Sequence, residues 1–171
     1  MPRIRPSRPD EGSALQEIER RAGDQFRDIG MGDIADDEPV SIETLAAYAS
    51  DGRGWAAVTD DDRPVGYVIV DRIDGAAHIE QVSVLPAHQG TGIGRALVDQ
   101  VHAWAADNDL PSITLTTFID VPWNQPLYEH LGFTVMAEAD IGPELHAVRD
   151  HEAAHGLDPA TRVCMRSRVQ Q

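Results

Sequence analysis

The sequence predicts a mixed α/β fold from two features of its hydrophobic pattern. Three β-rich segments, residues 55–59, 64–71 and 77–85, follow one another with no helix between them, which predicts an antiparallel meander. A helix-period segment and another β-branched run come next, as is typical of a βαβ crossover. Because 171 residues compare with roughly 150 for an average domain, we expect one domain, 1–171, in which flanking helices cover a single mixed sheet.

Spacing and capping residues place the other elements in order. Residues 2–6 are expected to form a first strand, and residues 15–22 carry apolar side chains at helical spacing after it. Glycine and aspartate residues within 30–39 should end that helix, and Ser41 is the expected N-cap of the next one. Later we expect helices over residues 92–107, 125–131 and 143–155, and strands over residues 111–117, 133–137 and 162–169.

The third strand of the meander has irregular apolar spacing. Ile79 and Val82 are three residues apart, whereas Val82 and Val84 are two apart. Side chains on one face of a strand recur at every second position, so a β-bulge within residues 81–83 would restore the spacing. Burial of both faces of the strand would explain it equally well, and the sequence leaves the two explanations open.

The chain is strongly acidic, and all its basic residues are arginine. It has 14 basic and 29 acidic side chains, which gives a formal charge of −15. Binding to nucleic acid is disfavoured, because affinity for a polyphosphate backbone needs clustered basic residues. The region 31–62 is the most acidic part of the chain and contains a single basic residue, Arg53. Such a region is typical of a solvated surface, and it is also what a site for a cationic ligand would carry.

Membrane-spanning and secreted proteins fit the sequence poorly. The longest apolar run is residues 45–49, whereas a bilayer needs about twenty apolar residues. The basic N-terminus has no apolar stretch after it, so no secretory signal is expected. The lone cysteine, Cys164, excludes an internal disulfide and a thiolate zinc cluster. We therefore expect a cytoplasmic enzyme or binding domain with no membrane partner.

A glycine-rich turn before the helix at 92–107 carries the strongest chemical signal. Gly90, Gly92 and Gly94 stand at alternate positions, with Arg95 after them. Glycines let backbone N–H groups converge, and a helix start adds the positive end of its dipole, so a phosphate-bearing ligand is implied. A Walker loop is excluded because the chain has no lysine. A dinucleotide fingerprint fits poorly, because Arg95 stands where its third glycine should be.

This turn and a second stretch resemble a known family. Residues 89–95 (Gln-Gly-Thr-Gly-Ile-Gly-Arg), preceded by Val-Leu-Pro at 84–86, resemble the acyl-CoA-binding turn of the GNAT superfamily of N-acetyltransferases. Residues 124–133 (Asn-Gln-Pro-Leu-Tyr-Glu-His-Leu-Gly-Phe) are similar to the family's tyrosine-containing helix and the start of its next strand. The resemblance covers most of the chain. It implies a GNAT-like sheet with an N-terminal meander and a βαβ core that binds acetyl-CoA as co-substrate.

The resemblance also implies roles for particular residues. Backbone groups on the strand would bind the pantetheine arm, and those of the turn would bind the pyrophosphate. The coenzyme-binding residues implied are Val82, Ser83, Val84, Gln89, Gly90, Thr91, Gly92, Ile93, Gly94, Arg95 and Asn124. Asn124 departs from the pattern, because Val121 stands where the family often has asparagine, and capping of the short helix would also explain Asn124.

Acetyl transfer to an amine needs a base, because an alkyl amine with a pKa of about 10.4 is rarely neutral at pH 7. Glu80 and His78 lie two residues apart and so share one face of their strand. The resemblance favours Glu80, with His78 or a water relay as alternatives, and it implies that Tyr128 protonates the leaving thiolate. Structural roles at the sheet surface or in the core would account for the same residues. Since no nucleophilic side chain is needed, we expect direct attack in a ternary complex.

The family places its first helices and their connecting loop over the acceptor. Acidic residues of that loop, Asp36, Asp37 and Glu38, would then favour a cationic acceptor, which is either a small molecule or a peptide amine. The sequence does not decide whether the chain forms a homodimer. The alternative function is a non-catalytic module of the same fold that senses acyl-CoA without turning it over.

A competing motif lies near the C-terminus. Residues 151–155 (His-Glu-Ala-Ala-His) match the zinc-binding pattern His-Glu-x-x-His, which places two imidazoles one helical turn apart. No His or Glu follows the motif as the usual third ligand, and Asp158 is the only acid there. We therefore expect no metal site.

Overall fold

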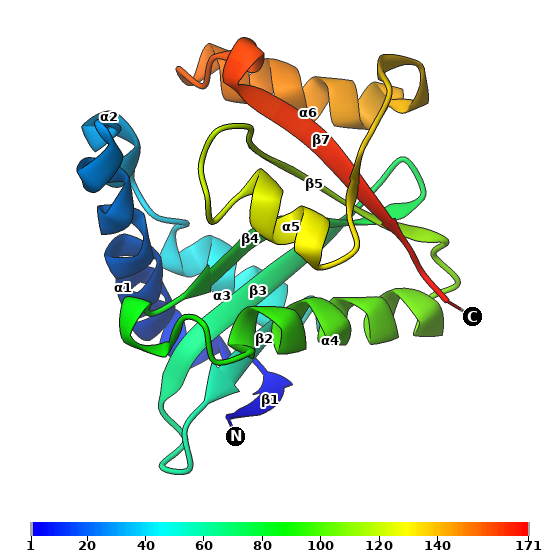
Figure 1. The fold of residues 1–171 in the computed structure, drawn as a ribbon. Helices are drawn as coiled ribbons and strands as arrows, with labels where there is room; N and C mark the ends of the chain where they lie inside the picture. Colours follow the sequence, from blue (N-terminus) through cyan, green and yellow to red (C-terminus); the bar gives the residue numbers. More distant parts are fainter. Residues whose placement is uncertain (1, 171) are drawn as a thin grey trace. The chain divides into compact units, whose positions relative to one another are not determined.

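The strands form a seven-stranded mixed sheet in the order β1-β2-β3-β4-β5-β7-β6 (Figure 1). The structure is a computed structural model that describes residues 2–170. The β4–β5 pair is parallel, and the β1–β2, β2–β3, β5–β7 and β6–β7 pairs are antiparallel. The predicted mixed α/β fold is therefore confirmed. The strands are β1 (Arg3–Pro6), β2 (Gly54–Val58), β3 (Pro64–Ile73), β4 (Ala76–Val84), β5 (Ser112–Phe118), β6 (Thr134–Val135) and β7 (Arg162–Arg168).

The helices follow the predicted order, and the chain forms two compact units. The first unit contains the described residues up to Val70 together with Glu80–Gln100, and the second contains Asp71–Ile79 and the described residues from Val101 onward. That residues 1–171 form a single domain stays a prediction. None of the helices in residues 2–170 is both long and apolar enough to cross a membrane. The α-helices are α1 (Gly12–Gly23), α2 (Gly32–Ala35), α3 (Ile42–Ser50), α4 (Ile93–Asp107), α5 (Gln125–His130) and α6 (Pro143–Ala154).

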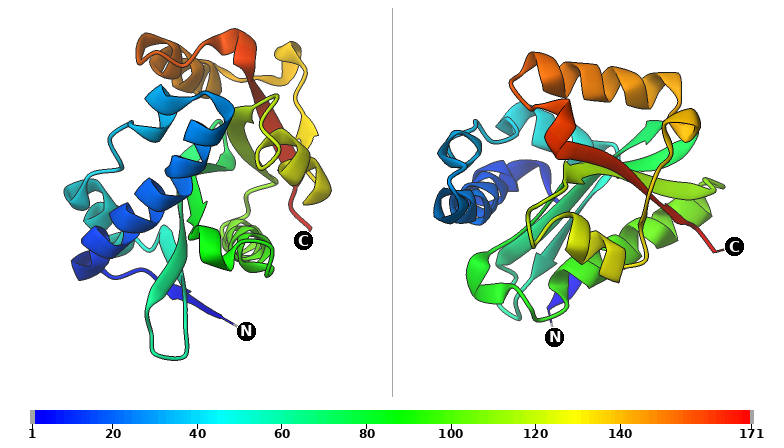
Figure 2. Two further views of the ribbon diagram at one scale, coloured as in Figure 1. Left: turned by 60° about the vertical axis from the view of Figure 1, so that its left-hand side comes forward. Right: turned by 45° about the horizontal axis from the view of Figure 1, so that its top comes forward.

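In the first unit, helices cover both faces of strand β3 (Figure 2). Tyr67 and Ile69 point to one face and pack with Leu15 and Ile18 of α1 and Leu45 of α3. Successive side chains of a strand point to opposite faces, so residue 66 faces the other way. The start of α4 lies on that second face.

Gly66 allows α4 to approach the sheet closely. A Cβ atom at this position would lie 3.1 Å from Ile93 Cγ2, 3.1 Å from the Ser83 carbonyl oxygen and 3.3 Å from Leu97 Cδ1. Ile93 and Leu97 are buried residues of the first turns of α4. The absence of a side chain at residue 66 therefore sets where the N-terminus of α4 lies against β3 and β4.

The β3–β4 hairpin supports the predicted bulge. Its tight turn, Asp74-Gly75, has positive φ at both residues, as in the two-residue turns that pair the flanking residues Ile73 and Ala76. At the far end, Leu85 N–H donates to the Val65 carbonyl (2.9 Å). Both pairings hold only if β4 contains one more residue than β3 between them, as a bulge in β4 would provide. The other explanation also holds in part, because residues 76–79 are all buried.

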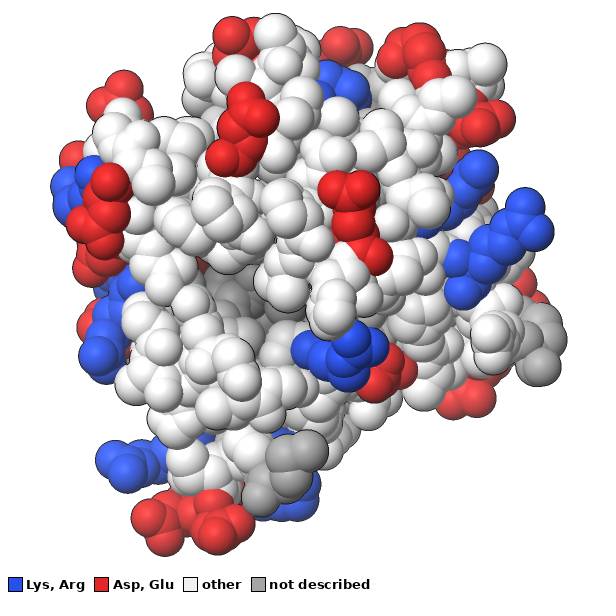
Figure 3. All heavy atoms as spheres, in the orientation of Figure 1, with Lys and Arg blue, Asp and Glu red and all other residues white. Residues whose placement is uncertain are grey.

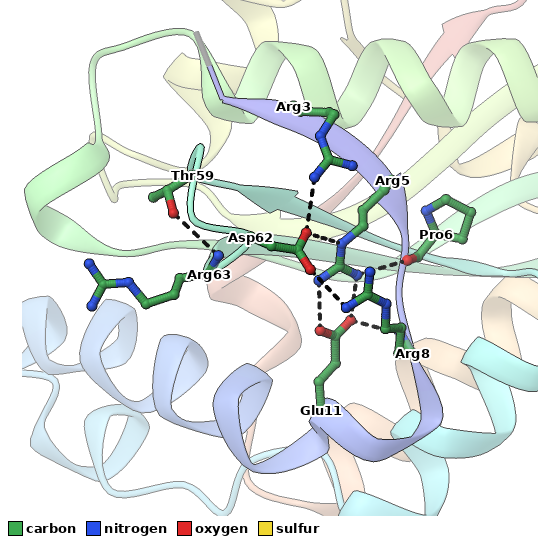
Figure 4. A network of polar contacts seen from close by, with 8 residues as sticks. All are labelled: Arg3, Arg5, Pro6, Arg8, Glu11, Thr59, Asp62 and Arg63. Atoms are coloured by element: carbon green, nitrogen blue, oxygen red, sulfur yellow. Dashed lines mark hydrogen bonds and ion pairs between the residues drawn. The ribbon is translucent and has the colours of Figure 1, made fainter.

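An ionic network fixes β1 to the β2–β3 hairpin (Figure 4). Arg3, Arg5 and Arg8 donate to the Asp62 carboxylate at 3.0, 2.9 and 2.8 Å. Arg5 also forms two hydrogen bonds of 3.0 Å with Glu11. The hydrogen bond from Arg5 is the largest cause that lowers the pKa of Asp62, to about 2. Asp62 is therefore ionised at neutral pH and holds the hairpin against β1.

In the second unit, α6 packs on β7 and is capped by the β3–β4 turn. Leu145 of α6 packs with Cys164 of β7 and with Ile141. The Asp74 carboxylate accepts from Glu144 N–H (3.0 Å) and Leu145 N–H (2.9 Å), so it satisfies two orphan donors at the start of α6.

Two expectations about elements need correction. The predicted strand 133–137 is only Thr134–Val135, because the chain turns into a 3₁₀ turn, Glu138–Asp140, soon after it. The predicted break at 30–39 contains the short helix α2. Ser41 caps α3 as predicted, with its side chain accepting from Thr44 N–H at 3.1 Å.

Candidate active site

The glycine turn leads from β4 to α4 in the first unit. Gly90 and Gly92 have φ of 77° and 90°, values that a residue with a side chain rarely adopts. The Thr91 hydroxyl donates to the His88 carbonyl (2.5 Å), which tightens the turn. The side chain of Gln89 donates to the Val84 carbonyl (3.1 Å) and so ties the turn to the end of β4. The predicted strand, turn and helix are therefore all present.

The start of α4 presents backbone donors. The first hydrogen bond of the helix runs from Ala96 N–H to Gly92 C=O (3.0 Å), so the N–H groups of Ile93, Gly94 and Arg95 have no intrahelical acceptor. A Cβ atom on Gly94 would meet no atom within 4 Å. Gly94 lies in the first turn of the helix, so its missing side chain leaves room for a ligand beside these donors. The donors and the open space fit a phosphate group, with the exposed Arg95 beside them.

The end of β4 precedes this turn. Val82 and Val84 are half-buried, and the buried Ser83 accepts from the side chain of Gln81 at 2.8 Å. The carbonyl oxygen of Val84 receives the hydrogen bond from Gln89. Glu80, the predicted base, is exposed.

A polar pair that the sequence did not reveal joins the half-buried Glu19 of α1 to the buried Tyr67 of β3. The hydroxyl of Tyr67 donates to the Glu19 carboxylate (2.8 Å), which also accepts from Val40 N–H (3.1 Å). Burial is the main cause that raises the pKa of both groups, and the charges of Glu19 and Glu80 raise the pKa of Tyr67 further. Glu19 thus anchors the chain where it enters α3. It follows the core residue Ile18 in the helical pattern, the only signal that could have drawn attention to it.

The predicted acceptor residues lie in a segment that is partly neutralised. We call residues 24–38 the acidic segment; it contains the 3₁₀ helix Asp24–Ile29 and α2. Arg27 forms ion pairs with Asp24 (3.5 Å) and Asp36, and its hydrogen bond lowers the pKa of Asp36. Burial, followed by the neighbouring Asp33 and Asp36, raises the pKa of Asp37. Glu38 is exposed. Figure 3 shows basic and acidic side chains next to one another along the edge where α1 and α2 lie.

In the second unit, His78 is enclosed. Its side chain is 2% exposed, and Nδ1 lies 2.9 Å from the hydroxyl oxygen of Thr114 on β5. Burial lowers the pKa of His78, so the ring is neutral at pH 7. A group so well buried can reach a substrate proton only through a relay.

Tyr128 lies on α5, and burial raises its pKa to about 12. Its ring packs edge-on against Phe133 with the centroids 5.8 Å apart. Its N–H donates to the Asn124 carbonyl (3.0 Å) in the first turn of the helix. Tyr128 therefore keeps its phenolic proton across the neutral pH range.

The expected side-chain cap from Asn124 is wrong. Its Oδ1 accepts instead from the Thr117 hydroxyl (2.7 Å) and from Phe118 N–H (3.4 Å) at the end of β5. Asn124 thus joins α5 to β5. Val121, which stands where the family often has asparagine, is buried.

The His-Glu-x-x-His segment is part of the fold. The carboxylate of Glu152 accepts from Arg162 (3.1 Å) and from the Thr116 hydroxyl (2.6 Å), and His155 Nδ1 contacts the His151 carbonyl. Within residues 2–170, no group of three or more His, Cys, Asp or Glu side chains is arranged to hold a metal ion. The polar atoms of Glu152 therefore stabilise the contact between α6, β5 and β7.

Comparisons with known proteins agree with this geometry. Residues 15–133 match the model of the Acetyltransferase (GNAT) family. The chain is 28% identical, over 141 residues, to "Peptidyl-lysine N-acetyltransferase YjaB" of Salmonella typhimurium; the match covers 81% of this chain and 87% of that protein. The counterpart from Escherichia coli is 26% identical over 141 residues, covering 81% and 86%.

Solved structures show the same fold. A GNAT acetyltransferase from Staphylococcus aureus superposes with a TM-score of 0.71 at 16% identity, covering 99% of this chain and 100% of that one. The PaiA N-acetyltransferase from Thermoplasma acidophilum, in complex with coenzyme A, superposes with a TM-score of 0.71 at 15% identity, covering 98% and 99%. Because the family model matches residues 15–133, the chain belongs to the GNAT family and is an N-acetyltransferase.

Proposed function

We propose that this chain transfers the acetyl group of acetyl-CoA to a primary amine on a cationic peptide or small molecule, by direct attack in a ternary complex. The observation that carries the proposal is the start of α4, where the N–H groups of residues 93–95 have no intrahelical acceptor and a Cβ atom on Gly94 would meet open space. This arrangement fits a pyrophosphate held by residues 89–95, with the pantetheine arm along Val82, Ser83 and Val84. We assign no coenzyme contact to Asn124 Oδ1, because β5 already occupies it.

For the chemistry, we assign the base to Glu80 and the acid to Tyr128. The neutral amine attacks the thioester carbonyl carbon, the C–S bond breaks, and the amine loses a proton. Glu80 is exposed and can accept that proton directly or through water, whereas His78 is buried. Tyr128 can protonate the leaving sulfur, because its pKa of about 12 keeps it protonated. Glu80 then releases its proton to solvent, and Tyr128 regains one from solvent, so the net proton balance is zero.

The acceptor follows from charge and from the relatives. Arg27 forms its ion pairs with Asp24 and Asp36, and not with Asp37 or Glu38. The charges of Asp37 and Glu38 can therefore attract a cationic acceptor, which supports that acceptor class. The name of the curated relatives, peptidyl-lysine N-acetyltransferase, supports a lysine side chain in a peptide. A lysine ε-ammonium has the charge that such a segment would attract, and deprotonation makes it the nucleophile.

The first experiment combines binding and turnover. Thermal unfolding is measured with and without acetyl-CoA, and free-thiol release is measured with a panel of lysine peptides, polyamines and neutral amines. Saturation at about 100 times the dissociation constant should stabilise the protein by about 2.7 kcal/mol. Because the chain has no lysine, acetyl-lysine formed in the reaction reports the acceptor alone. A thermal shift without release from any amine would favour an acyl-CoA sensor, and no shift would contradict the coenzyme site.

Substitution of the proposed acid and base separates chemistry from binding. We expect Tyr128→Phe and Glu80→Gln each to lower kcat by about 10²- to 10⁴-fold, the usual contribution of a positioned acid or base. The dissociation constant of acetyl-CoA, measured by calorimetry, should stay within about twofold for both. Glu17→Gln, an exposed carboxylate on α1, is the matched control for Glu80. Unchanged kcat in Tyr128→Phe would remove that residue from the mechanism.

Neutralisation of the acidic segment tests the acceptor class. We expect Asp37→Asn with Glu38→Gln to raise KM for a lysine peptide several-fold at low salt, because two charges that attract the acceptor are lost. Asp60→Asn with Asp61→Asn, exposed acidic residues of the β2–β3 hairpin, change the net charge equally and are the control. Equal effects of the two pairs, or preference for neutral amines, would contradict a cationic acceptor held by this segment.

A further inference from the structure

Two glutamine side chains join the glycine turn to the acidic segment within the first unit. Gln25, in the 3₁₀ helix that follows α1, donates from Nε2 to Gln89 Oε1 at 2.7 Å. Gln89 in turn donates from Nε2 to the Val84 carbonyl at 3.1 Å, and the same Nε2 lies 3.5 Å from Gln25 Oε1. A continuous line of hydrogen bonds thus runs from the acidic segment, through the turn, to the end of β4.

The chemistry of the groups fixes the direction of this line. A carbonyl oxygen can only accept, so Gln89 must present its NH₂ group to Val84. Its oxygen therefore points to Gln25, which must donate. A reversed amide at either glutamine would bring two donors or two acceptors together, so only one arrangement satisfies all three residues.

The acidic segment is braced internally, so that Gln25 can act on all of it. Arg27 forms ion pairs with Asp24 and with Asp36, the residue that follows α2. In addition, Met31 N–H donates to the Phe26 carbonyl at 2.8 Å. These contacts hold the 3₁₀ helix and α2 together. A hydrogen bond at Gln25 therefore fixes the position of the segment relative to the turn.

We propose that Gln25 is a positioning residue that couples acceptor binding to coenzyme binding. It holds Gln89, and through it the glycine turn, in one arrangement with the acidic segment. Coenzyme bound in the turn then stabilises the placement of the acceptor residues, and by thermodynamic linkage the acceptor tightens the coenzyme equally. The inference rests on the proposed function, because it needs the turn to bind acetyl-CoA.

A double-mutant cycle on the full chain tests the coupling. We expect Gln25→Ala and Gln89→Ala each to raise the calorimetric dissociation constant of coenzyme A by about twofold to tenfold, the effect of one hydrogen bond. The double variant should match the weaker single variant, because both remove the same contact. Gln25→Glu should also weaken binding, since a carboxylate oxygen would replace the Nε2 that donates to the Gln89 oxygen. Gln100→Ala, another glutamine of the first unit, should bind as the unchanged protein does.

The KM for the acceptor is a quantity that a purely structural role of Gln25 would not change. At saturating acetyl-CoA, Gln25→Ala should raise KM for the lysine peptide about twofold to tenfold while kcat stays within about twofold. Additive single effects, or an unchanged dissociation constant in Gln25→Ala with an unchanged melting temperature, would overturn the proposal. If Gln25→Ala unfolds, Gln25→Asn replaces it. The asparagine side chain is one methylene shorter, so its amide cannot reach the Gln89 oxygen that Gln25 contacts at 2.7 Å. Absence of coenzyme binding in the unchanged protein would instead contradict the proposed function itself.

Discussion

The start of α4 has backbone N–H groups without an intrahelical acceptor, whereas the end of α6 has a carboxylate that is already hydrogen-bonded. At α4, the N–H groups of residues 93–95 have no intrahelical acceptor, and open space lies next to Gly94. At α6, the Glu152 carboxylate is already shared between Arg162 and Thr116. Both segments match ligand-binding patterns in the sequence. The difference teaches that a motif indicates a site only where the fold has left its polar groups unused.

The largest effect expected from this comparison concerns Gly94. Gly94→Leu should raise the dissociation constant of coenzyme A more than tenfold, because the side chain fills the space that a phosphate would need. The melting temperature should not fall, since leucine favours a helix more than glycine does. Calorimetry and thermal unfolding measure the two effects. Gly23→Leu, at a second helical glycine with no atom within 4 Å of its Cβ position, is the control.

Glu152 should behave in the opposite way. Glu152→Ala should lower the free energy of unfolding by about 1–3 kcal/mol, because it leaves the half-buried Arg162 without its ionic partner. Binding of coenzyme A and turnover by the folded fraction should not change. Denaturant unfolding and thiol release measure these quantities, with His155→Ala, an exposed residue of the same motif, as control. Loss of turnover on addition of a metal chelator would reverse this assignment.

The smallest effect expected concerns Asp62 and appears in the pH dependence of stability. The folded protein holds the pKa of Asp62 at about 2, below its ordinary value of 3.8. Its contribution to stability is therefore complete above pH 4 and is lost as the pH falls through about 2. Asp62→Asn should flatten the stability profile between these values, as measured by unfolding in a series of buffers. Asp61→Asn, an exposed neighbour, should leave the profile unchanged. An equal slope in both variants would show that the arginine network does not bind the ionised form preferentially.

Local patterns in the sequence predicted most elements of the fold. The β-branched runs, the Ser41 cap and the glycine turn act within a few residues, so their spacing is visible in the sequence. Asn124 was misassigned because a cap and a bond to β5 need the same side-chain oxygen, and only the fold decides between them. The strand at 133–137 was overestimated because pairing with β7 ends where the chain turns away.

The site was predictable only where it lies within one segment. The turn at residues 89–95 is such a segment, and its position between β4 and α4 is as expected. The contact of Gln25 with Gln89 joins residues 64 positions apart, and neither residue belongs to a pattern that suggests the other. Burial of His78 also depends on the neighbouring strand, which brings Thr114 to its ring.

Gly66 has a consequence for how sequence variation in this protein should be interpreted. Any side chain at this position meets Ile93, Leu97 and the Ser83 carbonyl within 3.3 Å, and so displaces the start of α4 from the strands. Gly66 is itself buried beneath the helix. A saturation-mutagenesis screen for coenzyme affinity would therefore score residue 66 among the most sensitive positions, although it lies one layer beneath the surface that a ligand can reach.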